Sequence, residues 1–109
     1  MYPKIINIRA TDCPIELEKK YIRWYEEVHV PMLFKIEEVR RVTRFECVDY
    51  DGSHPKFLSI YEFDDIFASQ KYESSIEVAE AKADVSKTWP ESEWKHRWKV
   101  KYKVTKVWE

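Results

Sequence analysis

The order of strand-like and helical patterns along the chain is the sequence feature that most constrains its fold. Four strand-like runs and two amphipathic stretches follow one another as strand, helix, strand, strand, helix, strand. The strands are predicted at residues 4–9, 39–50, 56–63 and 97–108, and the helices at 15–33 and 64–83. This order predicts an α+β domain built from two β-α-β halves that are joined by a hairpin.

Both helical stretches place their apolar side chains on one face, which predicts that each packs against a core. In the first helix this face consists of Leu17, Tyr21, Trp24, Val28 and Met32. In the second, which Asp64 and Asp65 are predicted to cap, it consists of Ala68, Tyr72, Ile76, Ala79 and Ala83. Pro31 lacks a backbone donor and disfavours helical geometry in the preceding residue, so we expect the first helix to end or kink there.

The three later strands differ in the composition of their two faces. The run at 39–50 is predicted to place Val39, Thr43, Phe45 and Cys47 on one face. The run at 56–63 is apolar on both faces, as expected for a central strand. In the run at 97–108, lysines alternate with aromatic and aliphatic residues. We interpret these lysines as the solvated face of an edge strand rather than as an anion site.

The fold that fits this order is a ferredoxin-like βαββαβ sandwich, with a four-stranded antiparallel sheet and both helices on one face. The other face of the sheet would then lack a covering layer. Aromatic residues occur on several of the strands, and a large exposed apolar face is unusual in a monomer. We therefore predict a homodimer in which two sheets pack together to form an α/β barrel.

Composition argues against several classes of function. The 109 residues are predicted to form a single domain, 1–109, and the net charge of −1 argues against nucleic-acid and membrane partners. The single glycine excludes glycine-rich phosphate-binding loops, and the cysteines and histidines have no metal-ligand spacing, so we expect neither a cofactor nor a metal. Two cysteines without a secretory signal favour a reduced protein in the cytoplasm.

The end of the first helix holds the strongest candidate site. His29 lies at the edge of the apolar face, and the usual imidazole pKa near 6.5 suits a general acid or base. The alternative is a helix-terminal histidine that binds free carbonyl groups. Tyr25 could hold a substrate oxygen, whereas Trp24 is favoured as a core residue over a ligand wall. Glu26 is predicted to be solvated, with orientation of His29 as the alternative.

Three further candidates come from the predicted strands. Tyr61 could line a cavity or lie at the dimer interface. Glu62 lies on an aliphatic strand face, where a buried carboxylate needs a partner, and His29, Arg40 or Arg44 could supply one. Cys47 is predicted to be a small core side chain rather than a nucleophile, and we retain it as a possible ligand contact.

Two segments resemble the EthD-like branch of the dimeric α/β-barrel superfamily. They are RWYEEVHVP at residues 23–31 and PKFLSIYEF at residues 55–63. In that branch a helix that ends in a Trp-Tyr…His-x-Pro pattern precedes an apolar strand that ends near Tyr-Glu. The resemblance assigns Trp24, Tyr25, His29 and Pro31 to the helix motif and Tyr61 with Glu62 to the strand.

The resemblance implies a small pocket, often without a cofactor, that acts on hydrophobic or aromatic compounds. Some relatives of this fold use a strand asparagine, which makes Asn7 a further candidate ligand contact. We expect a cofactor-independent dehydratase, isomerase or cyclase with a pocket between the first helix and the sheet. Two alternatives stay open, a non-catalytic protein that binds a small ligand or responds to stress, and a cofactor-free monooxygenase.

Overall fold

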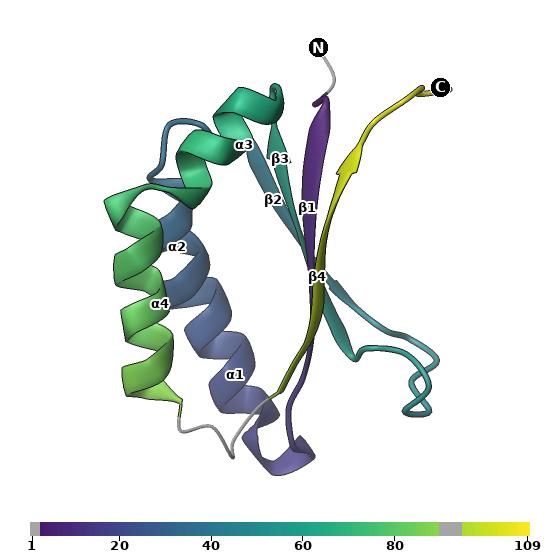
Figure 1. The fold of residues 1–109 in the computed structure, drawn as a ribbon. Helices are drawn as coiled ribbons and strands as arrows, with labels where there is room; N and C mark the ends of the chain where they lie inside the picture. Colours follow the sequence, from purple (N-terminus) through teal and green to yellow (C-terminus); the bar gives the residue numbers. More distant parts are fainter. Residues whose placement is uncertain (1–2, 90–94) are drawn as a thin grey trace.

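A computed structural model describes residues 3–89 and 95–109, and its four strands form one antiparallel sheet. The strands are β1 (Ile5–Asp12), β2 (Arg41–Glu46), β3 (Phe57–Phe63) and β4 (Lys95–Lys103). Their spatial order is β2-β3-β1-β4, and all helices lie on one side of the sheet (Figure 1). The predicted ferredoxin-like arrangement is confirmed, with β3 central and β4 at an edge.

The first helical element consists of several consecutive pieces. A 3₁₀ turn at Ile15–Leu17 precedes α1 (Glu18–Trp24), a π-helical segment at Tyr25–His29 and α2 (Val30–Phe34). In the π-helical segment, the Val30 N–H donates to the Tyr25 carbonyl, five residues back. Of the two outcomes expected at Pro31, an end of the helix is wrong, because the chain stays helical to Phe34, close to the predicted end at residue 33. The wider π turn instead changes the hydrogen-bond register just before the residue that has no N–H.

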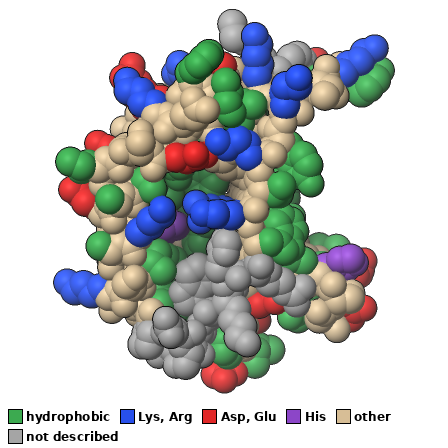
Figure 2. Space-filling model, viewed as in Figure 1, with side chains coloured by type: hydrophobic (Ala, Val, Ile, Leu, Met, Phe, Trp, Pro, Cys, Tyr) green, Lys and Arg blue, Asp and Glu red, His purple; other side chains and the backbone are tan. Residues whose placement is uncertain are grey.

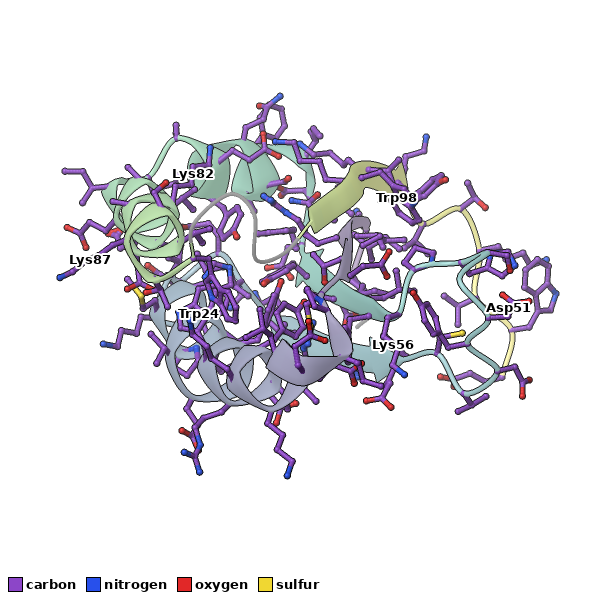
Figure 3. The ribbon with its side chains drawn as sticks, turned by 90° about the horizontal axis from the view of Figure 1, so that it is seen from below. Trp24, Asp51, Lys56, Lys82, Lys87 and Trp98 are labelled. Atoms are coloured by element: carbon purple, nitrogen blue, oxygen red, sulfur yellow. The ribbon has the colours of Figure 1, made fainter. Side chains whose placement is uncertain are left out.

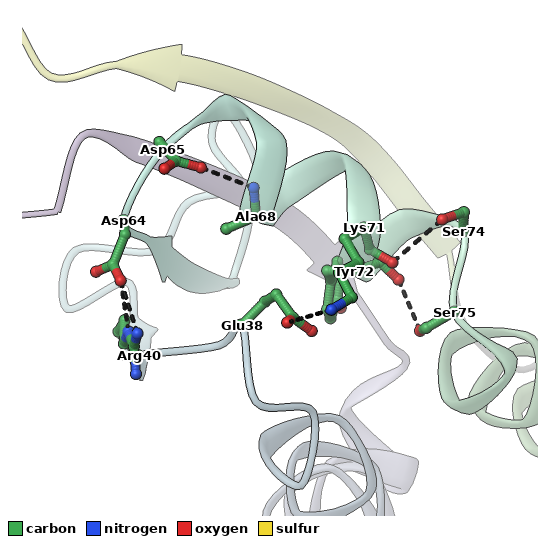
Figure 4. Close-up of polar contacts among 9 residues, drawn as sticks. All are labelled: Glu38, Arg40, Asp64, Asp65, Ala68, Lys71, Tyr72, Ser74 and Ser75. Atoms are coloured by element: carbon green, nitrogen blue, oxygen red, sulfur yellow. Dashed lines mark hydrogen bonds and ion pairs between the residues drawn. The ribbon is translucent and has the colours of Figure 1, made fainter.

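The second helical stretch is also divided, into α3 (Ile66–Glu73) and α4 (Ile76–Thr88). Asp65 caps α3 by accepting a hydrogen bond from the Ala68 N–H at 2.8 Å, as predicted for this pair of aspartates. Ser75 accepts from the first turn of α4 and also donates to the Tyr72 carbonyl at 2.7 Å (Figure 4). This break shifts the buried face, so Ile76, which was predicted to be buried, is exposed.

The alternation of residues along the strands decides which side chains reach the helices. On β3, Phe57, Ser59, Tyr61 and Phe63 are buried on the helix side. Arg9 of β1 lies opposite Ser59 and also opposite Lys99 of β4, so all three share this side. Lys99, Lys101 and Lys103 of β4 therefore lie on the helix side of the sheet, where they are still exposed to solvent, as we predicted for the lysines of this strand.

The strand predicted at 39–50 is shorter than expected. β2 covers only Arg41–Glu46, and Val39 is buried in the core at a turn before the strand begins. Phe45, predicted to share a face with Val39, is largely exposed. It pairs with Leu58, on the side of the sheet away from the helices.

The apolar core forms two clusters beneath the helices. One contains Leu33, Tyr61 and Tyr72, and the other contains Trp24 and Tyr25. Side chains of both clusters border a cavity that the helix layer and the sheet enclose.

Candidate functional site

The candidate site is a cavity of about 390 Å³ between the helices and the sheet. We predicted a pocket between the first helix and the sheet, and α4 closes it on a further side. Figure 2 shows the molecule hollowed here, with lysine and arginine side chains around the opening. The residues that line the cavity include Arg9, Tyr25, His29, Tyr61, Tyr72, Lys82 and Lys99.

The His29 ring is held in the cavity wall by two aromatic neighbours. It stacks on Trp24 with ring centroids 4.7 Å apart and an interplanar angle of 23°, and it meets Tyr25 edge-on at 4.9 Å. The Trp24 indole N–H donates to Asp84 on α4 at 2.9 Å. Trp24 is buried and does not line the cavity, so it supports His29 from behind, as a core residue.

The electrostatic environment keeps His29 neutral at pH 7. Burial lowers its pKa to about 4, with smaller lowering effects from Arg9 and Arg44 and an opposing effect from Asp84. Nδ1 is enclosed and has no hydrogen-bond partner among the described residues. The side chain as a whole is only half-buried and lines the cavity.

Two tyrosines place hydroxyl groups in the same cavity. The Tyr25 and Tyr61 hydroxyl oxygens are 3.3 Å apart. Burial raises the pKa of Tyr61 well above its usual value, so its hydroxyl stays protonated and can donate a hydrogen bond. The Arg44 guanidinium lies 3.8 Å from the centre of the Tyr25 ring and donates to Ser59 at 2.7 Å, which holds that ring in position.

Several lining residues escaped the sequence analysis. Tyr72, Arg9, Lys82 and Lys99 come from four different elements, α3, β1, α4 and β4. The alternation of β1 and β4 could have placed Arg9 and Lys99 on the helix side. Lys82 had no comparable signal, because it reaches the cavity only through the packing of α4.

The structure does not bring Glu62 into the site. It neighbours Tyr61 on β3, so its side chain points to the opposite face of the sheet. There Arg41, the residue directly across on β2, pairs with it, one bond being Nη2 to Oε1 at 3.1 Å. None of the expected partners His29, Arg40 and Arg44 pairs with its carboxylate. Arg40 donates only its backbone N–H to the Glu62 carbonyl, at 2.9 Å, and its guanidinium pairs with Asp64 (Figure 4).

The two remaining candidates also lie apart from His29. Asn7 lines an adjoining hollow of about 410 Å³, where its side-chain oxygen is buried without a partner. Cys47 follows β2 and is half-buried, and it lines neither of these two hollows. Glu26 is exposed, as predicted.

The fold and the cavity together define a class of protein, the ferredoxin-like α+β domains. Among solved structures, the chain is similar to HapK from Hahella chejuensis, with a TM-score of 0.72, 8% identity and 96% of both chains covered. An EthD family protein from Bacillus halodurans matches with a TM-score of 0.68 and 16% identity, over 93% of this chain and 99% of that one.

A third similar structure is a dimeric protein of unknown function and ferredoxin-like fold from Bacteroides fragilis, with a TM-score of 0.63 and 16% identity. It covers 95% of this chain and 100% of its own. No protein-family model and no curated protein matches the chain. The chain therefore has the ferredoxin-like fold of EthD-type and related dimeric proteins.

The described residues also bear on membrane and metal binding. None of the helices within residues 3–89 and 95–109 has the length and apolar character needed to cross a membrane. Within the same residues, no three histidine, cysteine or acidic side chains gather as metal ligands would.

Proposed function

We propose that this chain is a cofactor-independent enzyme that moves a proton on a small hydrophobic or aromatic oxygenated molecule. The observation that supports the proposal most directly is the position of His29. Its side chain lines a cavity that Tyr25 and Tyr61 also line, and the hydroxyl oxygens of these two tyrosines are 3.3 Å apart. A helix-terminal histidine that only binds carbonyl groups would have no cavity beside it.

The chemistry that suits these groups is proton abstraction next to a carbonyl. Neutral His29 accepts the proton at Nε2, and the electron pair of the broken C–H bond moves onto the carbonyl oxygen. A tyrosine hydroxyl donates a hydrogen bond to that developing oxyanion. Burial and the nearby arginines disfavour the imidazolium, so it readily returns the proton to another carbon, or to a departing hydroxyl that leaves as water.

The test is deuterium exchange at the carbon next to the carbonyl of 2-tetralone, followed by proton NMR in D₂O. Wild-type protein is expected to accelerate exchange, and His29→Asn should slow the catalysed rate about 100-fold or more, as for loss of a general base. His54→Asn is the control, since His54 is exposed in the turn between β2 and β3. Equal exchange rates for wild type and His29→Asn would exclude the proposed role.

A non-catalytic ligand-binding protein is the second candidate, and the lowered pKa of His29 favours it. A base with a pKa of about 4 is weak when the cavity is empty. Under this alternative, aromatic ligands bind in the cavity while neither wild type nor His29→Asn accelerates exchange.

We also propose that the chain is a homodimer joined through the free face of the sheet. Phe45, Trp98 and Tyr102 lie on that face and are 45%, 43% and 55% exposed. In Figure 3, Trp98 lies on the side of the sheet opposite the helices. Dimeric proteins with this fold support the proposal, and a second sheet would cover the apolar side chains.

A further inference from the structure

Three cationic side chains from three elements meet at the cavity. Arg9 and Lys99 lie directly opposite each other on β1 and β4, and Lys82 approaches from α4. The same three residues line the adjoining hollow that contains Asn7, together with Tyr72 and Val78. The two hollows are therefore parts of one recess, and the three cations lie where the parts join.

No carboxylate among residues 3–89 and 95–109 forms an ion pair with Arg9, Lys82 or Lys99. Two acidic side chains lie nearby. Glu73, which lines the adjoining hollow, forms an ion pair with Lys101 at 2.6 Å, and Lys99 also contributes to the lowering of its pKa. Asp84 accepts hydrogen bonds from Trp24 and Thr88. Among the described residues that line the recess, cationic side chains therefore outnumber acidic ones.

Unpaired like charges in a hollow are unfavourable in the empty protein, and they attract anions into it. Lys82 and Lys99 are exposed enough to remain hydrated, but Arg9 is only partly accessible. Lysines that protect a sheet edge point outward, whereas these face the helix layer. An anionic ligand group explains this placement better than edge protection does.

The rest of the cavity indicates what the anionic group is attached to. Beyond the cations, the walls around His29 are mostly aromatic or aliphatic and include Tyr25, Leu33 and Tyr61, with Thr11 and Ser86 as the other polar residues. We propose that the Arg9–Lys82–Lys99 cluster binds the carboxylate of a small aromatic acid whose ring lies beside His29. A planar guanidinium matches a carboxylate with two parallel hydrogen bonds. This inference rests on the proposed function, because it names the substrate class of the same cavity.

The experiment compares 2-naphthoate with 2-naphthamide, a neutral analogue of the same shape, by isothermal titration calorimetry on the whole chain. Wild type is expected to bind the acid at least about tenfold more tightly, and Arg9→Gln should remove most of that preference. Lys82→Gln should reduce it severalfold. Lys87→Gln, the matched control on α4, should leave affinity within about twofold, since Lys87 points away from the sheet (Figure 3).

Equal wild-type affinity for the acid and the amide, or binding of neither, would overturn the inference. Tighter binding of 2-naphthyl phosphate than of 2-naphthoate would overturn the choice of carboxylate. The wild-type comparison stands even if Arg9→Gln fails to fold, which a thermal melt followed by circular dichroism reveals.

The anion site and the proposed function can fail separately. His29→Asn should keep the preference for 2-naphthoate while it loses the exchange of 2-tetralone. Exchange without a preference for the acid would remove only the carboxylate assignment. A preference for the acid without exchange would remove only the catalytic role of His29.

Discussion

At the residue scale, the proposed function rests on His29, which the sequence already indicated as the strongest candidate. Helical spacing placed it at the edge of the apolar face, beside Tyr25, and both side chains do line the cavity. The sequence could not show how the ring is held. The stacking of Trp24 depends on Asp84, which lies 60 residues further along the chain. The lowered pKa depends first on burial and then on Arg9 and Arg44 from two strands.

The low pKa of His29 predicts a specific pH dependence of stability. The folded-state pKa of about 4 lies below the usual imidazole value of 6.5, so the unfolded chain binds the proton more tightly between these values. The contribution of His29 to the free energy of unfolding is therefore fully present above about pH 6.5. It decreases as the pH drops toward 4, by at most about 3 kcal/mol. Urea unfolding at pH 7.5, 6 and 5 measures this slope.

His29→Asn is the control for this slope. The variant should be less stable at pH 7.5, because it loses the stack on Trp24, but it should lose stability more slowly than wild type between pH 6.5 and 4.5. The carboxylates whose pKa values are lowered, Asp51 and Glu73, contribute equally in both proteins. Identical slopes would show that His29 is not held neutral by the fold.

At the element scale, the periodic patterns predicted the order of strands and helices but not their interruptions. Apolar spacing of three and four residues cannot distinguish an α-helix from one with a π turn, so the Tyr25–His29 segment was missed. The break before α4 was equally hidden, although Ser74 and Ser75 are residues that favour caps. The prediction that Glu62 lies in the site was wrong because neighbouring residues on β3 point to opposite sides of the sheet, and Glu62 is next to Tyr61.

The cap of α3 gives a prediction at this scale, and the two adjacent aspartates form a matched pair. Asp65→Ala removes the acceptor for the Ala68 N–H and should lower the free energy of unfolding by about 1 kcal/mol. Asp64→Ala removes only the exposed ion pair with Arg40 and should cost less than about 0.5 kcal/mol. Urea unfolding of both variants checks this order, and a larger loss for Asp64→Ala would contradict the assigned cap.

At the scale of the whole molecule, the sheet separates two kinds of surface by face. Residues that point toward the helices build the recess with its cations and tyrosines, while those that point away form an apolar surface with the Arg41–Glu62 pair. The order of elements predicted this two-layer arrangement and the uncovered face. It could not predict the recess, because that depends on how far α4 stands from the sheet.

The dimer prediction follows from the apolar face. Static light scattering should give wild type twice the mass of one chain, and Trp98→Glu combined with Tyr102→Glu should give a single-chain mass. In the centre of a sheet-to-sheet contact, two carboxylates would face apolar groups without a partner. The free energy needed to bury them is several times that contributed by the aromatic contacts they replace. Val48→Glu adds the same kind of charge at an exposed position outside the sheet and should leave the dimer intact. A wild-type monomer, or a double variant that still dimerises, would mean that the two sheets do not form the barrel.

The recess opens on the other side of the sheet, so the monomeric variant should still bind 2-naphthoate more tightly than 2-naphthamide.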